Sequence, residues 1–576
     1  MYLRSTQRRR KDGSIVRYLQ LAHNRRVGGL TRAEVLLNLG REDQLDVDGL
    51  RRLARSITRF TDPGTSEPSP IEGTDAEGLE VVGSRAFGGA WALDALWRRL
   101  GVADALRRSL GARRFQTDVE RVLFALVANR ALAPCSKLAG AEWASHDVHL
   151  PGLDAMDEDQ AYRAMDVLVE ADSEAKVQEA VFSACADLLN LEVDVLFFDT
   201  TSTYFEVEGE DVGAPGVDEL PGGDRGPLAE AAQRRRGNSK DHRPDLPQVV
   251  IGLAVTREGI PVRVWVWPGN TNDQSVIASV KDDLRGWRLG RVVWVVDRGF
   301  SSEENLRYLR RGGAHWIAGE RMRDGHPEHE AALARQGRYR RVRDNLRVKQ
   351  VTVGEGDAAK RFVVCHNPSE AERDRARREE TIRRLEEELT RLEAQRSRAK
   401  GAQARATHLR GECALRDHPT LGRHLRQLRS GRLRIDRGAV RAEERLDGKF
   451  LLSTSDPELS AEDVALGYKN LLEAERSFRE LKGALALRPV FHRLEHRIRA
   501  HILICWLALL MIRVAERETE RTWRTIAREL GRLHLVTLAG QAGAVSQTTP
   551  LTPEQREILT ALAIDPPPRI TALDPT

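Results

Sequence analysis

The amino-acid sequence predicts an α/β fold for the central part of this 576-residue chain, and three observations lead to that prediction. Short β-rich runs alternate with helical patterns between residues 190 and 320. Two apolar runs end in an aspartate, at Asp199 and at Asp297, and α/β domains build their sites at such strand ends. Two further runs flank the tight turn REG at 257–259, which is typical of a β-hairpin.

The order of the elements narrows the fold class. The expected strands are the runs VDVLFF, QVVIGLAVT, IPVRVWVW, RVVWVV, AHWIAG and KFLLSTS, in that order. The segments DQSVIASVKDDL and SEENLRYLRR are expected to form helices between them, and a helix that carries Glu475 follows the last strand. This order is typical of a ribonuclease-H-like fold: a strand, a hairpin pair, alternating helices and strands, and then a final helix.

The length and the local composition predict several domains, because one hydrophobic core rarely organises so long a chain. A stretch rich in Pro, Gly and Ser marks a linker. Leucines spaced three and four residues apart around Leu385 and Leu389 predict a short helical hairpin. The predicted division is a small β-rich unit at 1–65, a linker at 66–87, a helical, candidate DNA-binding domain at 88–190, the first part of the catalytic core at 191–320, an inserted subdomain with the hairpin at 321–448, the second part of the core at 449–515, and C-terminal helices and tail at 516–576.

The charge, the cysteine content and the apolar runs limit the classes of partner and of site that this chain is expected to have. With 91 Lys and Arg against 86 Asp and Glu, basic residues matter mainly where they cluster, at Arg8–Lys11, Arg234–Lys240 and Arg423–Arg441. These runs are candidate contacts for a polyanion, and a solvated surface is the open alternative. The five cysteines form no CxxC pair, which indicates neither a disulfide framework nor a zinc site and fits a cytoplasmic location. The longest apolar run, Ile502–Ile512, is well short of the roughly 20 residues that span a bilayer, so a buried helix and no membrane partner are expected.

The segment from Tyr468 to Gly483 predicts one amphipathic helix. Its apolar residues recur at steps of three and four and form a core-facing stripe. The stripe consists of Leu471, Ala474, Phe478, Leu481 and Leu485. Tyr468, Glu475 and Lys482 are spaced seven residues apart, which returns each side chain to within roughly 20° of the last. They therefore form a polar band along the edge of the stripe.

Asp199, Asp297 and Glu475 together predict a metal site. Taken singly, each has an ordinary alternative as a turn, cap or surface residue. The element order brings the three carboxylates together, and without cysteine ligands they suit Mg²⁺ or Mn²⁺ rather than Zn²⁺. Two such ions about 3.5–4 Å apart activate the attacking oxygen and stabilise the leaving oxygen of a phosphodiester displacement. Tyr468 and Lys482 are then placed to hold a neighbouring phosphate.

The motifs around these acids resemble a known family. FFDTTSTYFE at Asp199, VVDRGF at Asp297 and YKNLLEAERSFRELKG at Glu475 are similar to motifs of the DDE transposases of bacterial insertion sequences. The branch is the insertion-sequence-four-like superfamily, which carries a Tyr, Arg, Glu and Lys signature. GNSKDHRPDLPQVVIGLAV at 237–255 and PGNTND at 268–273 also look like segments of one subgroup of these transposases.

The signature is incomplete in this chain. Tyr468, Glu475 and Lys482 match it, whereas Leu471 stands at the position of the Arg. The candidates to replace that Arg are Lys469, Arg476 and Arg479.

The resemblance implies a metal-dependent nuclease and strand-transfer enzyme. Asp199, Asp297 and Glu475 would bind the divalent metal, water would cut at the element's end, and the freed 3′-hydroxyl would attack target DNA. The implied partners are double-stranded DNA, as terminal inverted repeats and target, and a second copy of the chain in a homodimer on DNA. The residues predicted to contact DNA phosphates are Tyr468, Lys482, Arg476, Arg479, Arg298 and Lys240, with Arg423–Arg441 as a further candidate. An inactivated or domesticated DNA-binding relative, or a structure-selective ribonuclease-H-like nuclease, is the alternative.

Overall fold

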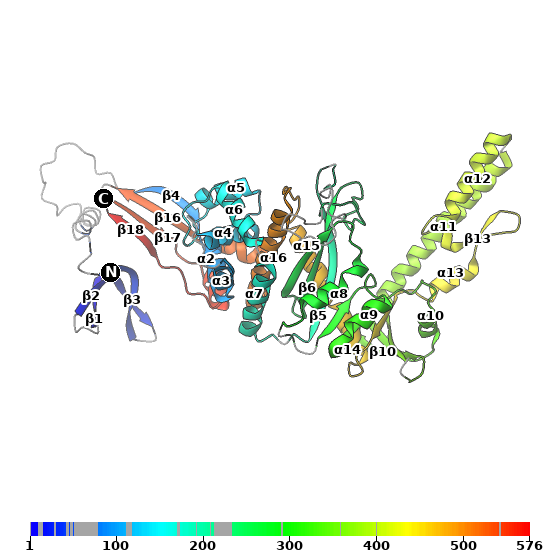
Figure 1. Ribbon diagram of the computed structural model, residues 1–576, viewed down its shortest axis with the longest axis horizontal. Coiled ribbons are helices and arrows are strands. Elements are labelled where there is room, and N and C mark those ends of the chain that lie inside the picture. The colour runs from blue at the N-terminus through cyan, green and yellow to red at the C-terminus, as the bar shows by residue number, and fades with distance from the viewer. Residues whose placement is uncertain are drawn as a thin grey trace, which may run out of the picture.

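The computed structural model describes residues 2–9, 15–27, 30–41, 45, 50, 54, 79–110, 118–169, 173–191, 193–207, 209–211, 233–287, 289, 292–356, 359–398, 400–540 and 543–575. The molecule is elongated, with a small sheet at one end and a helical hairpin projecting from the other (Figure 1). A mixed sheet flanked by helices lies between them, which confirms the predicted α/β class.

The central sheet has nine strands in the order β10-β11-β12-β15-β9-β8-β5-β6-β7. Their bounds are β5 (Val195–Tyr204), β6 (Gln248–Thr256), β7 (Pro261–Pro268), β8 (Val293–Val296), β9 (His315–Glu320), β10 (Arg340–Arg343), β11 (Leu346–Val353), β12 (Lys360–His366) and β15 (Lys449–Thr454). β5, β8 and β9 are parallel to one another. The other neighbours are antiparallel, including the predicted hairpin of β6 and β7.

Helices cover both faces of this sheet. Its side chains alternate between two cores, so Phe197 belongs to one core and Phe198 to the other. α14 (Ala461–Lys469) and α15 (Leu472–Lys482) cover the Phe197 face. α8 (Ile277–Asp283) and α9 (Glu303–Leu309) cover the Phe198 face.

The helix α16 (Glu495–Thr519) is the centre of the larger core. Ile502–Ile512 is buried throughout, as the sequence predicts. Among the described residues this single helix is long and apolar enough to cross a membrane, but 94% of its apolar window is buried within the protein, so it is a core helix. It packs against the helical region at 88–189, whose helices are α2 (Gly88–Arg99), α3 (Val102–Leu110), α4 (Val119–Leu132), α5 (Lys137–Glu142), α6 (Glu158–Val169) and α7 (Ser173–Leu189).

Two smaller sheets lie outside the central part. β1 (Tyr2–Arg9), β2 (Ile15–Val27) and β3 (Leu30–Arg41) form an antiparallel sheet within the predicted β-rich unit. A second sheet has the order β18-β17-β16-β4. Its strands are β4 (Glu80–Ala86), β16 (His534–Gly540), β17 (Gly543–Thr548) and β18 (Ile570–Pro575), while α17 (Trp523–Leu530) and α18 (Pro553–Ala561) lie between them in the chain.

This second sheet corrects two predicted segments. The linker expected at 66–87 includes strand β4, which pairs with β16 more than 400 residues later, and residues 66–78 lie outside the described part. The C-terminal segment at 516–576, expected to hold helices and a tail, contributes three strands. Val81 and Val82 in β4 are both exposed, so no buried alternation in the sequence signals a strand that depends on a distant partner.

The inserted region at 321–448 also differs from expectation in two ways. Its strands β10, β11 and β12 extend the central sheet through the pairing of β12 with β15. The hairpin forms from α11 (Pro368–Arg398) and α12 (Ala402–Arg416), with Leu385 and Leu392 in its small core. With 31 residues α11 is not short, because Glu–Arg pairs three and four residues apart continue the helix along its surface. α13 (Arg437–Glu444) completes the insertion.

Close packing at Gly252 predicts a measurable stability cost. Gly252 lies opposite Thr200 where β6 pairs with β5, and an added Cβ would lie 2.5 Å from the Trp267 ring. Gly252→Ala should therefore lower the free energy of unfolding by about 1–3 kcal/mol. The midpoint of chemical denaturation, followed by tryptophan fluorescence, measures the change. Gly209→Ala is the control, because an added Cβ there meets no atom within 4 Å, and equal midpoints for the two variants would contradict this packing.

Candidate active site

The register of two parallel strands places Asp199 beside Asp297. Phe198 of β5 lies opposite Val296 of β8, so the two aspartates are the next residues on neighbouring strands. Neighbouring strands lie roughly 4.8 Å apart. Since side chains alternate along a strand, both carboxylates lie on the Phe197 face, which α14 and α15 cover.

One of the two predicted strand ends is wrong. Asp297 directly follows β8, as expected, but β5 continues past Asp199 to Tyr204. The extension pairs with β6 alone, because the pairing of β5 with β8 stops at Phe198. The polar run TTSTY after Asp199 hides this continuation in the sequence, although Thr200 and the residues up to Thr203 are buried.

The predicted helix from Tyr468 to Gly483 is two helices. α14 ends at Lys469 and α15 begins at Leu472, with a turn in which the Leu471 N–H donates to the Tyr468 carbonyl at 3.0 Å. The apolar stripe is confirmed, since all five of its residues are buried. The continuous polar band is wrong, because Tyr468 lies on α14 while Glu475 and Lys482 lie on α15.

The turn directs Tyr468 at the second aspartate. Its hydroxyl donates to Asp297 Oδ1 at 2.7 Å. Burial raises the pKa of Tyr468, and the Asp297 carboxylate raises it further, so the phenol stays a neutral donor. The ring lies directly over Gly319 of β9, where a Cβ would collide with the hydroxyl. A carboxylate, rather than a phosphate, is therefore the partner of Tyr468 in this structure.

Glu475 shares a pocket with Asp297. The pocket has a volume of about 260 Å³ and lies between the end of β8 and the turn that joins α14 to α15. Glu475 is exposed at its rim, and Lys469 and the buried Leu471 also line it. Lys469 is thus the candidate replacement for the missing Arg of the signature that lies beside the two acids.

Asp199 is a carboxylate whose charged form is disfavoured by its surroundings. Burial raises the pKa of Asp199 to about 6, although the Lys240 ammonium and the Thr200 N–H, which donates to Asp199 Oδ1 at 2.7 Å, oppose the rise. The carboxylates of Asp297 and Asp273 raise it further. A divalent cation would relieve this concentration of negative charge.

Lys240 contacts the back of the Asp199 strand. Its ammonium donates to the Thr200 carbonyl at 2.8 Å and pairs with Asp273 Oδ2 at 3.0 Å. The Thr200 hydroxyl donates to Asp273 Oδ1 at 2.7 Å. Sequence reasoning assigned no role to Asp273, although it lies in the quoted motif PGNTND, because one aspartate before a helix resembles an ordinary cap.

The other predicted phosphate contacts divide into paired and exposed side chains. Lys482 pairs with the buried carboxylate of Asp241 at 2.7 Å, with its own side chain only 13% exposed. Arg476 pairs with Glu516 at 3.0 Å and with Glu480 at 3.2 Å. Both cations are thus engaged in ion pairs within the protein, and their contact with DNA phosphates stays a prediction.

Arg298 and Arg479, like the paired Arg476, are exposed members of the predicted set. Arg298 follows Asp297 and lines a second pocket, of about 720 Å³, which also holds residues of β9, α9 and β12.

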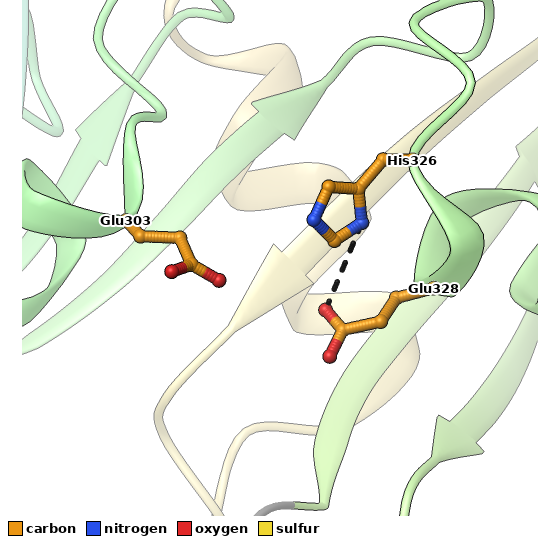
Figure 2. A group of neighbouring side chains, drawn as sticks. All are labelled: Glu303, His326 and Glu328. Carbon is orange, nitrogen blue, oxygen red and sulfur yellow. Dashed lines mark ion pairs between the residues drawn. The ribbon is translucent and has the colours of Figure 1, made fainter.

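A second group of metal-ligand type lies in that larger pocket. Glu303, His326 and Glu328 converge there, and the His326 ring pairs with the Glu328 carboxylate (Figure 2). The Lys360 ammonium pairs with Glu328 at 2.7 Å and with Glu303 at 3.0 Å. One ammonium offsets only one of the two carboxylate charges, so Lys360 leaves part of the negative charge of the group uncompensated.

In the described structure the ligand atoms of Asp199, Asp297 and Glu475 do not all lie within 4.8 Å of one another, as those of Glu303, His326 and Glu328 do. The three acids nevertheless have the chemistry of a divalent-metal site. They offer carboxylate oxygens, which Mg²⁺ and Mn²⁺ prefer, and no described cysteine lies among the residues lining the Asp297 pocket. Burial is the main cause of the raised pKa of Asp199, with smaller contributions from the carboxylates of Asp297 and Asp273, so a cation beside Asp199 would favour its charged form.

Comparison with known proteins identifies the family. The model of the IS1634 family transposase N-terminal domain matches residues 3–68, and that of the transposase DDE domain matches residues 225–511. Asp297 and Glu475 fall inside the second match, and Asp199 precedes it. No curated protein matches the chain.

Among solved structures, the chain is similar to a piggyBac transposase synaptic complex with hairpin DNA, determined by cryo-EM. The identity is 9%, with 77% of this chain and 79% of that chain covered and a TM-score of 0.35. With both family domains matched in order along the sequence, the chain belongs to the DDE transposases of bacterial insertion sequences, the enzymes that carry out DNA transposition.

Proposed function

We propose that the protein performs cut-and-paste transposition, cleaving DNA at the ends of its element and joining the freed ends to target DNA. The register that places Asp199 beside Asp297 carries this proposal. The strand order β7-β6-β5-β8-β9, antiparallel in its first three strands and parallel in its last three, supports a ribonuclease-H-like core.

Each residue of the site has a distinct role in the proposal. Asp199, Asp297 and Glu475 would hold two Mg²⁺ or Mn²⁺ ions through their carboxylate oxygens. When bound, the ions would activate the attacking oxygen and stabilise the leaving oxygen. Tyr468 orients Asp297 through its 2.7 Å hydrogen bond, so one oxygen of that carboxylate stays fixed while the other is available.

The proposed substrate is double-stranded DNA, as the element's terminal inverted repeats and as target. A homodimer that holds two ends and a cytoplasmic location complete the proposal. The helical region at 88–190 is the candidate for recognising end DNA, as are the exposed Arg298 and Arg479 beside the acids.

The insertion offers a further DNA-binding surface. β13 (Leu425–Gln427) and β14 (Leu433–Ile435) form a hairpin in which Arg426 lies directly opposite Arg434, both exposed. Like charges directly opposite each other destabilise a strand pair. A bound phosphate backbone would relieve this repulsion, which supports the basic run Arg423–Arg441 as a DNA-facing segment.

Removing one carboxylate should stop cleavage and spare DNA binding. Glu475→Gln removes a metal-binding charge with little change of shape. Losing a residue that only supports a metal ligand costs roughly 10–100-fold, so losing the ligand itself should lower metal-dependent cutting of the gene's own flanking DNA by at least about 100-fold. Gel-based cleavage with Mg²⁺ or Mn²⁺ measures it, alongside binding in a chelator. Glu473→Gln, two residues away on α15, is the matched control. Cleavage by Glu475→Gln at the wild-type rate would contradict the proposal.

The arginine pair predicts a change in salt dependence. Replacing Arg426 and Arg434 together by Gln should make the plot of log affinity for DNA against log salt shallower by roughly 0.9 for each phosphate that the protein no longer neutralises. Fluorescence anisotropy between low and moderate salt measures the slope. The control replaces Arg383 and Arg391, which pair with glutamates on α11. An unchanged slope in the hairpin variant, or the same change in the control, would show that the hairpin does not bind DNA.

A further inference from the structure

We propose that Asp273 is a positioning residue of the active site, which holds the Asp199 strand from behind through Thr200 and Lys240. The inference rests on the proposed function, because it assigns Asp273 a part in presenting Asp199 to the metal.

Strand β5 loses its pairing with β8 just before Asp199. The pairing of β5 with β8 ends at Phe198, one residue before Asp199. From Asp199 onward β5 keeps hydrogen-bonded pairing only with β6. The edge that faces β8 therefore needs other partners at the point where the strand presents its catalytic carboxylate.

Lys240 and Asp273 supply those partners. The Lys240 ammonium donates to the Thr200 carbonyl at 2.8 Å, and Asp273 accepts from the Thr200 hydroxyl at 2.7 Å. The Lys240 backbone N–H donates to Ser202 Oγ at 2.9 Å, which fixes the lysine to the same strand. Thr200 and Ser202 are buried, whereas the side chains of Lys240 and Asp273 are 32% and 25% exposed, so these bonds are partly shielded from water.

Asp273 links the other two groups. One of its carboxylate oxygens takes the Thr200 hydroxyl and the other pairs with Lys240 at 3.0 Å. The Thr200 N–H in turn donates to Asp199 Oδ1 at 2.7 Å, which connects the clamp to the catalytic carboxylate. We call the set Asp273, Lys240 and Thr200 the back clamp.

The charge of Asp273 has a second consequence. Lys240 is the strongest cationic influence on Asp199. Without Asp273, this ammonium would lose its paired carboxylate and would compete for Asp199 with an incoming cation. The pair therefore anchors β5 on the face opposite to that of the Asp199 carboxylate.

The loop that carries Asp273 is itself held in place. The Asn272 side chain accepts from the Gln274 N–H at 3.0 Å, and Asn305 of α9 donates to the Gln274 carbonyl at 2.9 Å. A fixed carboxylate can position its partners with little entropic cost. This arrangement distinguishes the back clamp from an exposed ion pair such as Arg243 with Asp245.

The test measures Mn²⁺ binding by the full-length protein without DNA, using the electron paramagnetic resonance signal of free Mn²⁺. Asp273→Asn should weaken the affinity by about 10–100-fold, the usual effect of losing a group that orients a metal ligand. Thr200→Val, which removes the hydroxyl, should act in the same direction, and Thr200→Ser should restore binding. Asp245→Asn, the same substitution in an exposed ion pair, is the control and should bind Mn²⁺ as wild type does.

A double-mutant cycle separates positioning from direct ligation. If Asp273 acts through Thr200 and Lys240, Asp273→Asn should cost much less in a background that carries both Thr200→Val and Lys240→Met than in wild type. An equal cost in both backgrounds would show that Asp273 acts on the metal without these partners and would overturn the inference. So would wild-type Mn²⁺ affinity in both Asp273→Asn and Thr200→Val.

The failure of the underlying function has a different signature. If Glu475→Gln binds Mn²⁺ as wild type does, the assignment of the metal site is overturned, and the role proposed for the back clamp is overturned as well. If Glu475→Gln is impaired and the back-clamp variants are not, only the inference about Asp273 is overturned. DNA binding in a chelator and circular dichroism show whether each variant is folded.

Discussion

The active site depends on the pairing of two parallel strands. With Phe198 opposite Val296, Asp199 and Asp297 follow on neighbouring strands and on the same face of the sheet. A shift of one residue in either strand would send one carboxylate to the opposite face, because side chains alternate along a strand. The two cores that pack against the sheet fix this register, since the alternating Phe197 and Phe198 each have a core to enter.

Glu475, the third acid, is positioned by the packing of α15 against the sheet. α15 buries Ala474, Phe478 and Leu481 against the sheet, which leaves Glu475 at the edge of the pocket that Asp297 lines. The turn at 470–471 separates α15 from α14, whose Tyr468 donates to Asp297. Two short helices thus contribute a carboxylate and a phenol to the pocket that Asp297 lines.

The sequence predicted the strands and the hairpin of the central sheet, because apolar runs and strand order carry that information. The convergence of Asp199, Asp297 and Glu475 on one metal stays a prediction. The sequence missed the break at Leu471, since a buried leucine fits the apolar stripe whether or not the helix continues. It missed β4 and the extension of β5 for a related reason: the first is exposed and the second is polar, and both depend on distant partners. Asp273 escaped notice because its role lies in contacts with Thr200 and Lys240 that only the folded chain brings together.

The central claim is that Asp199, Asp297 and Glu475 converge on one divalent metal site. Replacing the metal by Fe²⁺ and generating hydroxyl radicals cuts the backbone near the bound ion, and mass spectrometry locates the cuts. If the three acids share one site, the cuts should lie close to all three residues, and excess Mg²⁺ should suppress all of these cuts together. Cuts confined to the neighbourhood of Glu303, His326 and Glu328, or no localised cutting, would contradict the central claim.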